Sequence, residues 1–179
     1  MGARRPEGSA PGDSDEGGIE PGRSHPGRRR RRLDAREAAI AMLARRDHSR
    51  AELERRLLSQ GYSAEALAAL IPELIESRAL DDVRFAHHYV SYHVARGQGP
   101  LRIRVELEAL GVGAELLEAA LALEQDWPAL AREQRSRRFG PGMPVSRVEQ
   151  LRQARFLQSR GFSSDHIRAA LGADLQADS

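Results

Sequence analysis

The chain has 179 residues, of which 30% are charged and 40% hydrophobic, and it contains no cysteine. This composition suits a soluble globular protein and excludes disulfide scaffolds, thiolate zinc sites and cysteine catalysis. No apolar run approaches the roughly 20 residues that a transmembrane helix needs, and no signal-peptide core is present. We therefore expect no membrane contact, and the absence of cysteine is compatible with a reducing cytosol.

The net charge of +2 is unevenly distributed along the chain. Residues 1–32 carry +3, residues 33–126 carry −5 and residues 127–171 carry +6. An Arg-rich face favours phosphate or acidic partners, although a solvated surface explains the same charge equally well. The C-terminal third is therefore the first place to look for a binding surface.

The first 32 residues contain seven Gly and four Pro and show no apolar periodicity. Such a segment buries too little apolar surface to offset the entropy of ordering it. We predict a disordered tail. Its Arg28–Arg32 run either adds non-specific affinity for nucleic acid or has no binding role.

From Leu33 onward the apolar residues recur at helical spacing, and no stretch alternates as a strand would. The first helix is predicted to run from Asp34 to about Arg46. Another apolar stripe predicts a helix after Ser63, and we expect Pro72 to kink it because proline removes a backbone donor. Further helices are predicted to begin at the caps Asp81 and Asp126.

A 50-residue repeat surrounds three glycines, Gly61, Gly111 and Gly161. Apolar residues stand four positions before each glycine and one, six and ten positions after it. Glycine can take the left-handed conformation that ends a helix. In such a cap, the apolar residue directly after the glycine contacts the apolar residue four positions before the glycine. Each glycine is therefore predicted to form the corner of a helix-turn-helix unit.

The predicted fold is all-α, with three tandem three-helix, helix-turn-helix-like repeats in an elongated array. The repeats span residues 33–80, 81–125 and 126–172, between a disordered tail (1–32) and a C-terminal tail (173–179). Pro100 suits the first position of its helix. Because each repeat is too small for a full core, we expect neighbours to share apolar surface.

The sequence offers no constellation for catalysis, metal binding or a cofactor. His87, His88 and His93 lack ligand spacing. The pair Asp81 and Asp82 stands at a helix start, where carboxylates cap the helix and favour its dipole. We therefore predict a protein that is not an enzyme.

Arginines at helical spacing are the better candidates, because they can follow a phosphate backbone or an acidic groove. Acidic residues in the helices after Ser63 and Gly113 argue against sequence-specific reading of a major groove by those helices. The candidate partner- or DNA-binding residues are Arg102, Arg104, Arg132, Arg135, Arg137, Arg138, Arg152 and Arg155.

Three strings resemble the RecX family of bacterial regulatory proteins. They are Arg50 to Leu57 followed by Gly61 and Tyr62, Leu80 to Ala86 followed by Tyr89 and Val90, and Gly99 to Leu107 followed by Gly111 and Val112. The resemblance covers residues 33–172 and is looser in the third repeat. We expect structural roles for the third corner glycine, Gly161, and for these residues of the strings: Gly61, Gly111, Asp81, Asp82, Arg84, Phe85, Gly99, Pro100 and Ile103.

The resemblance implies a cytosolic, all-helical protein, which we expect to be a monomer. It implies binding to the RecA recombinase, chiefly to the RecA filament on single-stranded DNA, and inhibition of its ATPase, strand-exchange and coprotease activities. It implies no catalytic centre, and it allows direct binding of single- or double-stranded DNA. The alternative is an autonomous helix-turn-helix DNA-binding protein that does not depend on RecA.

The charge distribution adds one expectation to this resemblance. An elongated body can touch several filament subunits and gain avidity, with the basic third repeat facing nucleic acid. We therefore predict that reversing Arg135 and Arg138 to Glu weakens DNA or filament binding and leaves the fold intact.

Overall fold

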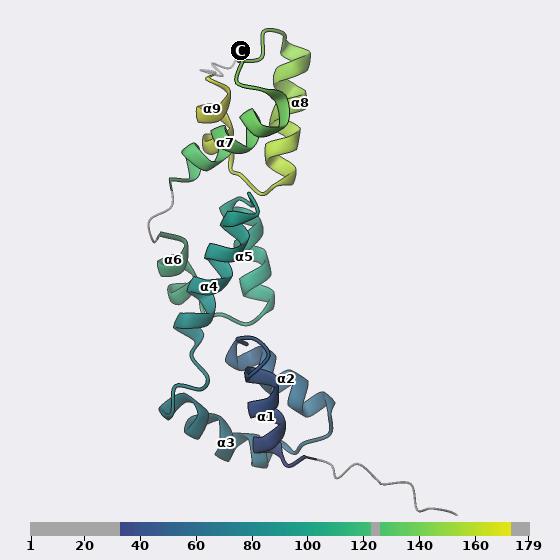
Figure 1. The fold of residues 1–179 in the computed structure, drawn as a ribbon, viewed down its shortest axis with the longest axis vertical. Helices are drawn as coiled ribbons and strands as arrows, with labels where there is room; N and C mark the ends of the chain where they lie inside the picture. The colour runs from purple at the N-terminus through teal and green to yellow at the C-terminus, as the bar shows by residue number, and fades with distance from the viewer. Residues whose placement is uncertain (1–32, 123–125, 173–179) are drawn as a thin grey trace, which may run out of the picture. The chain divides into compact units, whose positions relative to one another are not determined.

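The computed structural model describes residues 33–122 and 126–172, and all of its regular secondary structure is helical. The predicted tails, residues 1–32 and 173–179, lie outside the described residues. The all-α fold with three-helix repeats is confirmed for the described part (Figure 1). Its helices are α1 Ala35–Leu43, α2 Arg50–Ser59 and α3 Ala64–Glu76 in repeat 1, α4 Asp82–Ala95, α5 Pro100–Ala109 and α6 Ala114–Ala122 in repeat 2, and α7 Trp127–Phe139, α8 Arg147–Ser159 and α9 Ser164–Leu171 in repeat 3.

The predicted caps begin the first helix of each repeat. The side chains of Asp34, Asp81 and Asp126 each accept a hydrogen bond from the backbone N–H three residues later, which satisfies a donor that the helix leaves unpaired. Helix α1 ends at Leu43, earlier than predicted. Helix α3 runs without interruption through Pro72.

The three glycine corners have the predicted geometry. Gly61, Gly111 and Gly161 have φ values of 84°, 80° and 90°, in the left-handed region. Each glycine N–H donates to the carbonyl three residues before it, and the next residue's N–H donates to the carbonyl five before it, which is the Schellman pattern. The latter bonds are Tyr62 to Leu57 at 3.2 Å, Val112 to Leu107 at 3.1 Å and Phe162 to Leu157 at 3.2 Å.

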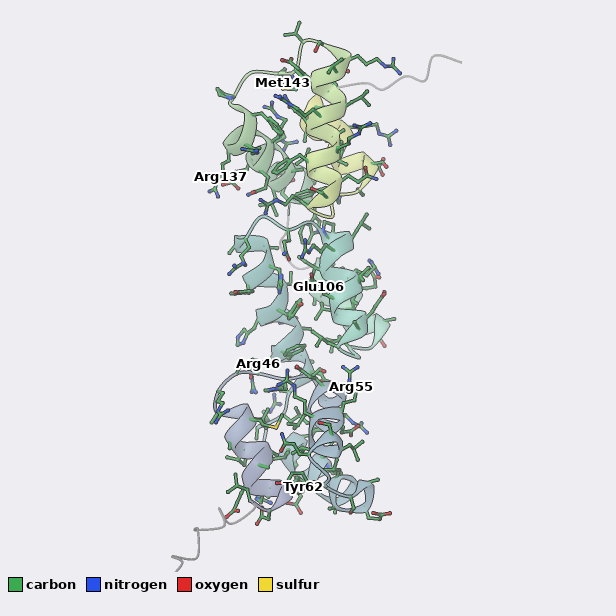
Figure 2. All side chains as sticks on the ribbon, turned by 90° about the vertical axis from the view of Figure 1, so that its right-hand side faces the viewer. Arg46, Arg55, Tyr62, Glu106, Arg137 and Met143 are labelled. Carbon is green, nitrogen blue, oxygen red and sulfur yellow. The ribbon has the colours of Figure 1, made fainter. Side chains whose placement is uncertain are left out.

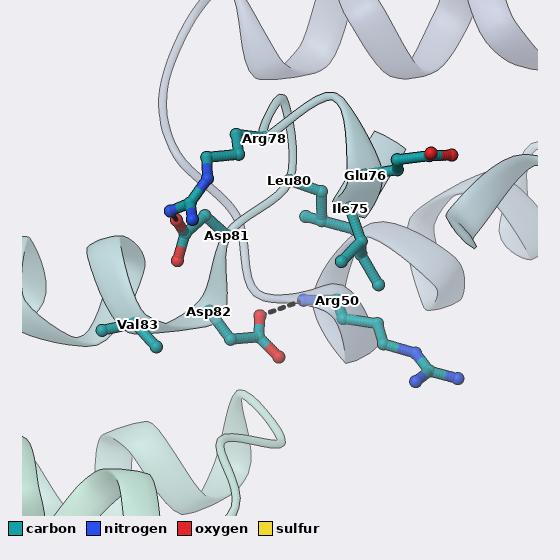
Figure 3. A pocket seen from close by; sticks show the side chains of 8 residues that line it. All are labelled: Arg50, Ile75, Glu76, Arg78, Leu80, Asp81, Asp82 and Val83. Carbon is teal, nitrogen blue, oxygen red and sulfur yellow. Dashed lines mark hydrogen bonds and ion pairs between the residues drawn. The ribbon is translucent and has the colours of Figure 1, made fainter. Parts of the chain in front are cut away.

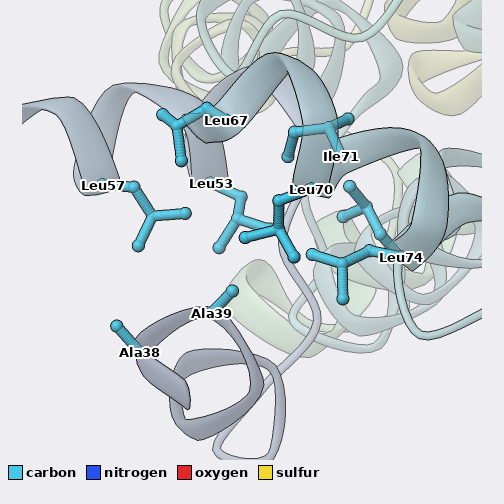
Figure 4. Close-up of a cluster of buried hydrophobic side chains, with 9 residues drawn as sticks. Ala38, Ala39, Leu53, Leu57, Leu67, Leu70, Ile71 and Leu74 are labelled. Carbon is cyan, nitrogen blue, oxygen red and sulfur yellow. The ribbon is translucent and has the colours of Figure 1, made fainter. Parts of the chain in front are cut away.

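Each repeat has a separate buried cluster. In repeat 1 the small Ala38 and Ala39 of α1 face leucines of α2 and α3 (Figure 4). Trp127 packs against the clusters of both repeat 2 and repeat 3. Repeats 2 and 3 therefore share apolar surface through Trp127, as expected, whereas the buried clusters of repeats 1 and 2 have no described residue in common.

Polar contacts between helix ends form the junction of repeats 1 and 2, here called the first joint. The Ser49 hydroxyl donates to the Leu110 carbonyl at 2.5 Å, and the Arg50 N–H donates to Asp82 at 2.7 Å. The Arg55 guanidinium donates to the Ala109 carbonyl at 3.0 Å. The N-terminus of α2 therefore meets the corner that follows α5.

The second joint, between repeats 2 and 3, places the N-terminus of α5 against the corner that follows α8. The Gly99 N–H donates to the Arg160 carbonyl at 2.8 Å, and the Leu101 N–H donates to the Gly161 carbonyl at 3.0 Å. A Cβ on Gly161 would overlap Arg102 and lie 2.7 Å from its backbone nitrogen. Glycine is therefore needed here both for its φ and for the close approach of α5.

Candidate nucleic-acid and partner interface

The motif residues at the start of α4 have structural positions, as expected. Asp81 caps α4 and Asp82 accepts from the first N–H of α2. The Arg84 guanidinium donates to Asp47 and to the carbonyls of residues 78 and 79. Arg84 thereby ties the α1–α2 loop to the α3–α4 linker, and Phe85 is buried in the repeat 2 cluster.

Asp47 sits between two cationic or proton-donating side chains at this joint. Arg84 lies at 3.1 Å and His88 Nδ1 at 2.9 Å from its carboxylate. Burial alone would raise the pKa of Asp47, but the hydrogen bonds from His88 and Arg84 lower it. The carboxylate therefore remains ionised down to acidic pH.

The second group of motif residues serves the joint and the core. Gly99 and Pro100 form the N-terminus of α5 at the second joint, with Pro100 at the start of the helix as predicted. Ile103 is fully buried in the repeat 2 cluster. These positions leave no side chain free to contact a partner.

Two candidate arginines on α5 are already paired. Arg102 forms an ion pair with Glu106 at 2.9 Å, and Arg104 forms one with Glu118 of α6. The hydrogen bond to Glu118 raises the pKa of Arg104. A phosphate contact by either guanidinium would compete with a carboxylate of the same repeat, so both are weaker candidates than unpaired arginines.

Arg135 is not available to a partner, which corrects the prediction made from its charge. It is only 3% exposed, and its guanidinium donates to the carbonyls of Pro141 at 3.2 Å and Gly142 at 2.7 Å. Its Nη1 lies 3.5 Å from the Gln153 side-chain oxygen. Arg135→Glu would bury a carboxylate among these carbonyls, so it would not leave the fold intact.

Three basic side chains gather around two phenylalanines of repeat 3, in what we call the Arg–Phe cluster: Arg138, Phe139, Arg152, Phe156 and Arg160. The two rings meet edge to face at 5.4 Å. Arg138 and Arg152 lie over Phe139 at 6.0 and 5.3 Å, and Arg160 lies over Phe156 at 5.3 Å. Stacking holds a guanidinium by its face and leaves N–H groups on its edge to donate.

Three exposed arginines of repeat 3 lie outside this cluster without a carboxylate partner in the described chain: Arg132, Arg147 and Arg155. Arg137, labelled in Figure 2, is also exposed but pairs with Glu133 at 2.6 Å. Among the predicted binding residues of repeat 3, Arg132, Arg138, Arg152 and Arg155 therefore remain candidates. The ion pair makes Arg137 a weaker candidate, and burial excludes Arg135.

Sequence reasoning missed Arg147 and Arg160. A signal for Arg160 was present, since Phe156 precedes it by four positions on the same predicted helix, which is the spacing of neighbouring side chains. No comparable sequence signal singled out Arg147, which begins α8.

Two histidines of α4, His88 and His93, have structural partners. His93 stacks on Tyr89 with ring centroids 4.1 Å apart and contacts Gln98. Burial and the hydrogen bond to Glu106 raise the pKa of Tyr89 to about 12, so its hydroxyl stays protonated at neutral pH.

Across residues 33–122 and 126–172, no cluster of His, Asp and Glu has a metal-binding arrangement. In the same residues, no helix has both the length and the apolar character to cross a membrane.

Comparisons with known proteins cover most of the described chain. Models of the first, second and third three-helix domains of RecX match residues 35–74, 81–121 and 124–171. Regulatory protein RecX of Halorhodospira halophila is 46% identical over 139 residues, covering 77% of this chain and 86% of that protein. Its counterpart in Xanthomonas axonopodis pv. citri is 40% identical over 151 residues, covering 84% and 93%. The crystal structure of RecX from Lactobacillus salivarius matches with a TM-score of 0.66 and 26% identity, covering 77% and 92%.

Proposed function

Since the chain belongs to the RecX family of regulatory proteins, we propose that it binds the RecA recombinase and its filament on single-stranded DNA. Binding inhibits the ATPase, strand-exchange and coprotease activities of RecA. The protein acts in the cytoplasm as a monomer and has no catalytic centre of its own. Family membership supports this proposal, as does a surface that offers separate regions to protein and to nucleic acid.

The single observation that carries the nucleic-acid part is the set of unpaired arginines in repeat 3. Residues 127–171 carry +6, and the Arg–Phe cluster places three guanidinium groups over two aromatic rings. Guanidinium donors match phosphate oxygens, and partly exposed rings offer bases a stacking surface. Repeat 3 is therefore the part that we assign to nucleic acid.

The other two repeats are suited to protein rather than to phosphate. Residues 33–126 carry −5, and the described residues of α3 and α6 include Glu65, Glu73, Glu76, Glu115 and Glu118. Their charge would repel a DNA backbone. Weak contacts to protein by repeats 1 and 2 and to phosphate by repeat 3 would reinforce one another because they are joined in one chain.

The experiment that tests this function measures ATP hydrolysis by RecA on single-stranded DNA while the protein is added below the RecA concentration. We expect inhibition at low ratios of protein to RecA. Unchanged hydrolysis, together with a persistent shift of bare DNA, would instead support the autonomous DNA-binding alternative.

A matched pair of charge reversals tests the assignment of repeat 3. Arg155→Glu and Arg45→Glu both change the net charge by the same amount at exposed positions, one in repeat 3 and one in repeat 1. We expect only Arg155→Glu to weaken binding to single-stranded DNA. Replacing Arg155 with Gln should also flatten the dependence of log K on log salt by about 0.7 if it contacts one phosphate. Equal losses from both reversals would show that only net charge matters.

A further inference from the structure

Two adjoining hollows run along the first joint and form what we call the joint groove. The larger part of its wall comes from α3 and from the linker to α4. One hollow has a volume of about 570 Å³ and reaches Val83 (Figure 3), and the other, of about 580 Å³, reaches Pro72. Arg50, Ile75 and Glu76 line both hollows, so the two are continuous.

The groove exposes large apolar side chains. Ile75 is 45% exposed and Val83 is 51% exposed, while Leu80 beneath them is buried. Figure 3 places Ile75 beside Leu80 on one wall and Val83 on another. Concave sites with apolar walls and a few polar groups are the usual form of binding pockets. The groove can therefore take an apolar side chain between α3 and the start of α4.

The polar groups around these walls are mostly hydrogen-bond acceptors. Four carboxylates line the groove, from Glu54, Glu76, Asp81 and Asp82, against two guanidinium groups. Arg50 pairs with Glu54 at 3.1 Å, and Arg78 lies 3.8 Å from Asp81. Glu76 at the exposed rim forms no ion pair with a described residue. The groove therefore favours an occupant that supplies positive charge.

The backbone of α3 points to the same chemistry. Pro72 lines the groove and has no N–H, so the helical hydrogen bond that it would give to the Ala68 carbonyl is missing. Ala68 also lines the groove and is exposed. A carbonyl that lacks its helical donor can accept from Lys or Arg, whose side chains carry only donors.

We propose that the joint groove binds a segment of a partner protein in which an apolar side chain stands next to Lys or Arg. The apolar side chain lies against Ile75 and Val83, and the cation lies near Glu76. Nucleic acid does not fit this site, because its phosphates would face the carboxylates. The proposal rests on the proposed function in one respect only, namely that the partner is RecA.

A peptide titration tests the groove without RecA. The probe is an acetylated and amidated tetrapeptide with Leu and Ile between a Lys and an Arg, and the control peptide has Glu at both ends. We expect the basic peptide to shift the NMR signals of Ile75 and Val83 in a saturable way, and the acidic peptide to shift neither. Shifts that are absent, that lie elsewhere, or that occur equally with the acidic peptide would overturn the proposal.

Two variants of the full chain sharpen this test. Glu76→Lys reverses charge at the rim, and Glu108→Lys makes the same change at an exposed position in the last turn of α5, outside the groove. We expect Glu76→Lys to lower the affinity for the basic peptide at least tenfold and Glu108→Lys to change that affinity less than twofold. Equal weakening by both variants would refute a specific role for the groove.

Binding to RecA distinguishes a failure of this proposal from a failure of the proposed function. We expect Glu76→Lys to weaken binding to the RecA filament while binding to bare single-stranded DNA is unchanged or stronger. Because the chain has no cysteine, Val83→Cys also provides a unique thiol for a photo-crosslinker, which should capture a Lys- or Arg-containing segment of RecA. If the peptide binds in the groove and the wild-type chain does not bind RecA, the groove is supported and the proposed function fails.

Discussion

The two joints are built from equivalent parts of the repeat but are held by different groups. At the second joint, two backbone N–H groups at the start of α5 donate to backbone carbonyls at the end of α8, and the Arg160 guanidinium adds one bond to the Arg96 carbonyl at 3.3 Å. At the first joint, the contacts run through side chains, from Ser49, Arg55, Asp82 and the Arg84–Asp47 pair. The same helix-end geometry can therefore be fixed either by the backbone or by side chains.

Because of this difference, the two joints should respond differently to salt, to pH and to amino-acid substitutions. Backbone bonds between neutral groups change little with salt or with pH near neutrality. Ion pairs and charge-assisted bonds are screened by salt, and they depend on the protonation of their members. Salt, pH and side-chain substitutions should therefore loosen mainly the first joint, whereas changes that push the backbones apart should loosen mainly the second.

The largest effect is expected for Gly161→Ala at the second joint. The added methyl group would overlap Arg102, and alanine would be strained at the φ of 90° that residue 161 has. Together the overlap and the strain should lower the free energy of unfolding by about 2–4 kcal/mol. Urea denaturation followed by circular dichroism measures this loss. Gly142→Ala is the control, since a Cβ there meets nothing within 4 Å. Similar losses for both substitutions would contradict the close approach at this joint.

A smaller loss is expected for Arg84→Gln at the first joint. The substitution removes the Asp47 ion pair and two bonds to linker carbonyls from a half-buried site, which should cost about 1–2 kcal/mol. Arg36→Gln, which breaks an exposed ion pair with Glu73, should cost at most about 0.5 kcal/mol. In 1 M NaCl the loss from Arg84→Gln should shrink, while the loss from Gly161→Ala should stay the same. A loss that does not depend on salt would show that charge does not hold the first joint.

The smallest effect concerns pH and His48, which precedes Ser49 at the first joint. Burial lowers the pKa of His48 below 6.5, in an environment that includes Arg46, Glu52 and Arg56. Below pH 6.5 the unfolded chain therefore binds a proton before the folded chain does, and stability is lost as pH falls. We expect a lower unfolding free energy at pH 5.5 than at pH 7.5, and a smaller difference in His48→Asn.

His166 in repeat 3 gives a matched comparison for this pH effect. Burial also lowers its pKa, so His166→Asn should reduce the same pH dependence without involving the first joint. Amide hydrogen exchange at Arg50 separates the two contributions. We expect acidification to lower the protection factor of the Arg50 amide, its exchange rate relative to the intrinsic rate at the same pH, in the wild type and in His166→Asn, and to lower it less in His48→Asn. Identical exchange in all three proteins would exclude His48 as the pH-sensitive group at the joint.

Features that depend on neighbouring residues could be predicted from the sequence. The glycine corners and the Asp caps follow from spacings of three to five residues, and both have the predicted geometry. The joints could not be predicted, because each of their hydrogen bonds connects residues at least 32 positions apart. No local pattern indicates which helix end meets which corner.

The error at Arg135 had a signal in the repeat itself. Val90 stands nine residues after the cap Asp81, and Arg135 stands nine residues after the cap Asp126. Val90 is buried, so the equivalent position should have been expected in the core. Charge alone assigned Arg135 to the surface, whereas the carbonyls of the 140–144 loop provide the partners that a buried guanidinium needs.

The order of the joints has a consequence for how the protein is made. At both joints the donor helix end is synthesised first and its acceptor corner follows 61 residues later, from Ser49 to Leu110 and from Gly99 to Arg160. A repeat that leaves the ribosome can form its own apolar cluster at once, since domains fold as units during synthesis. Its joint stays open until the next repeat has been translated. Stalling within a repeat therefore leaves an uncovered helix N-terminus, which a chaperone or a second nascent chain could occupy.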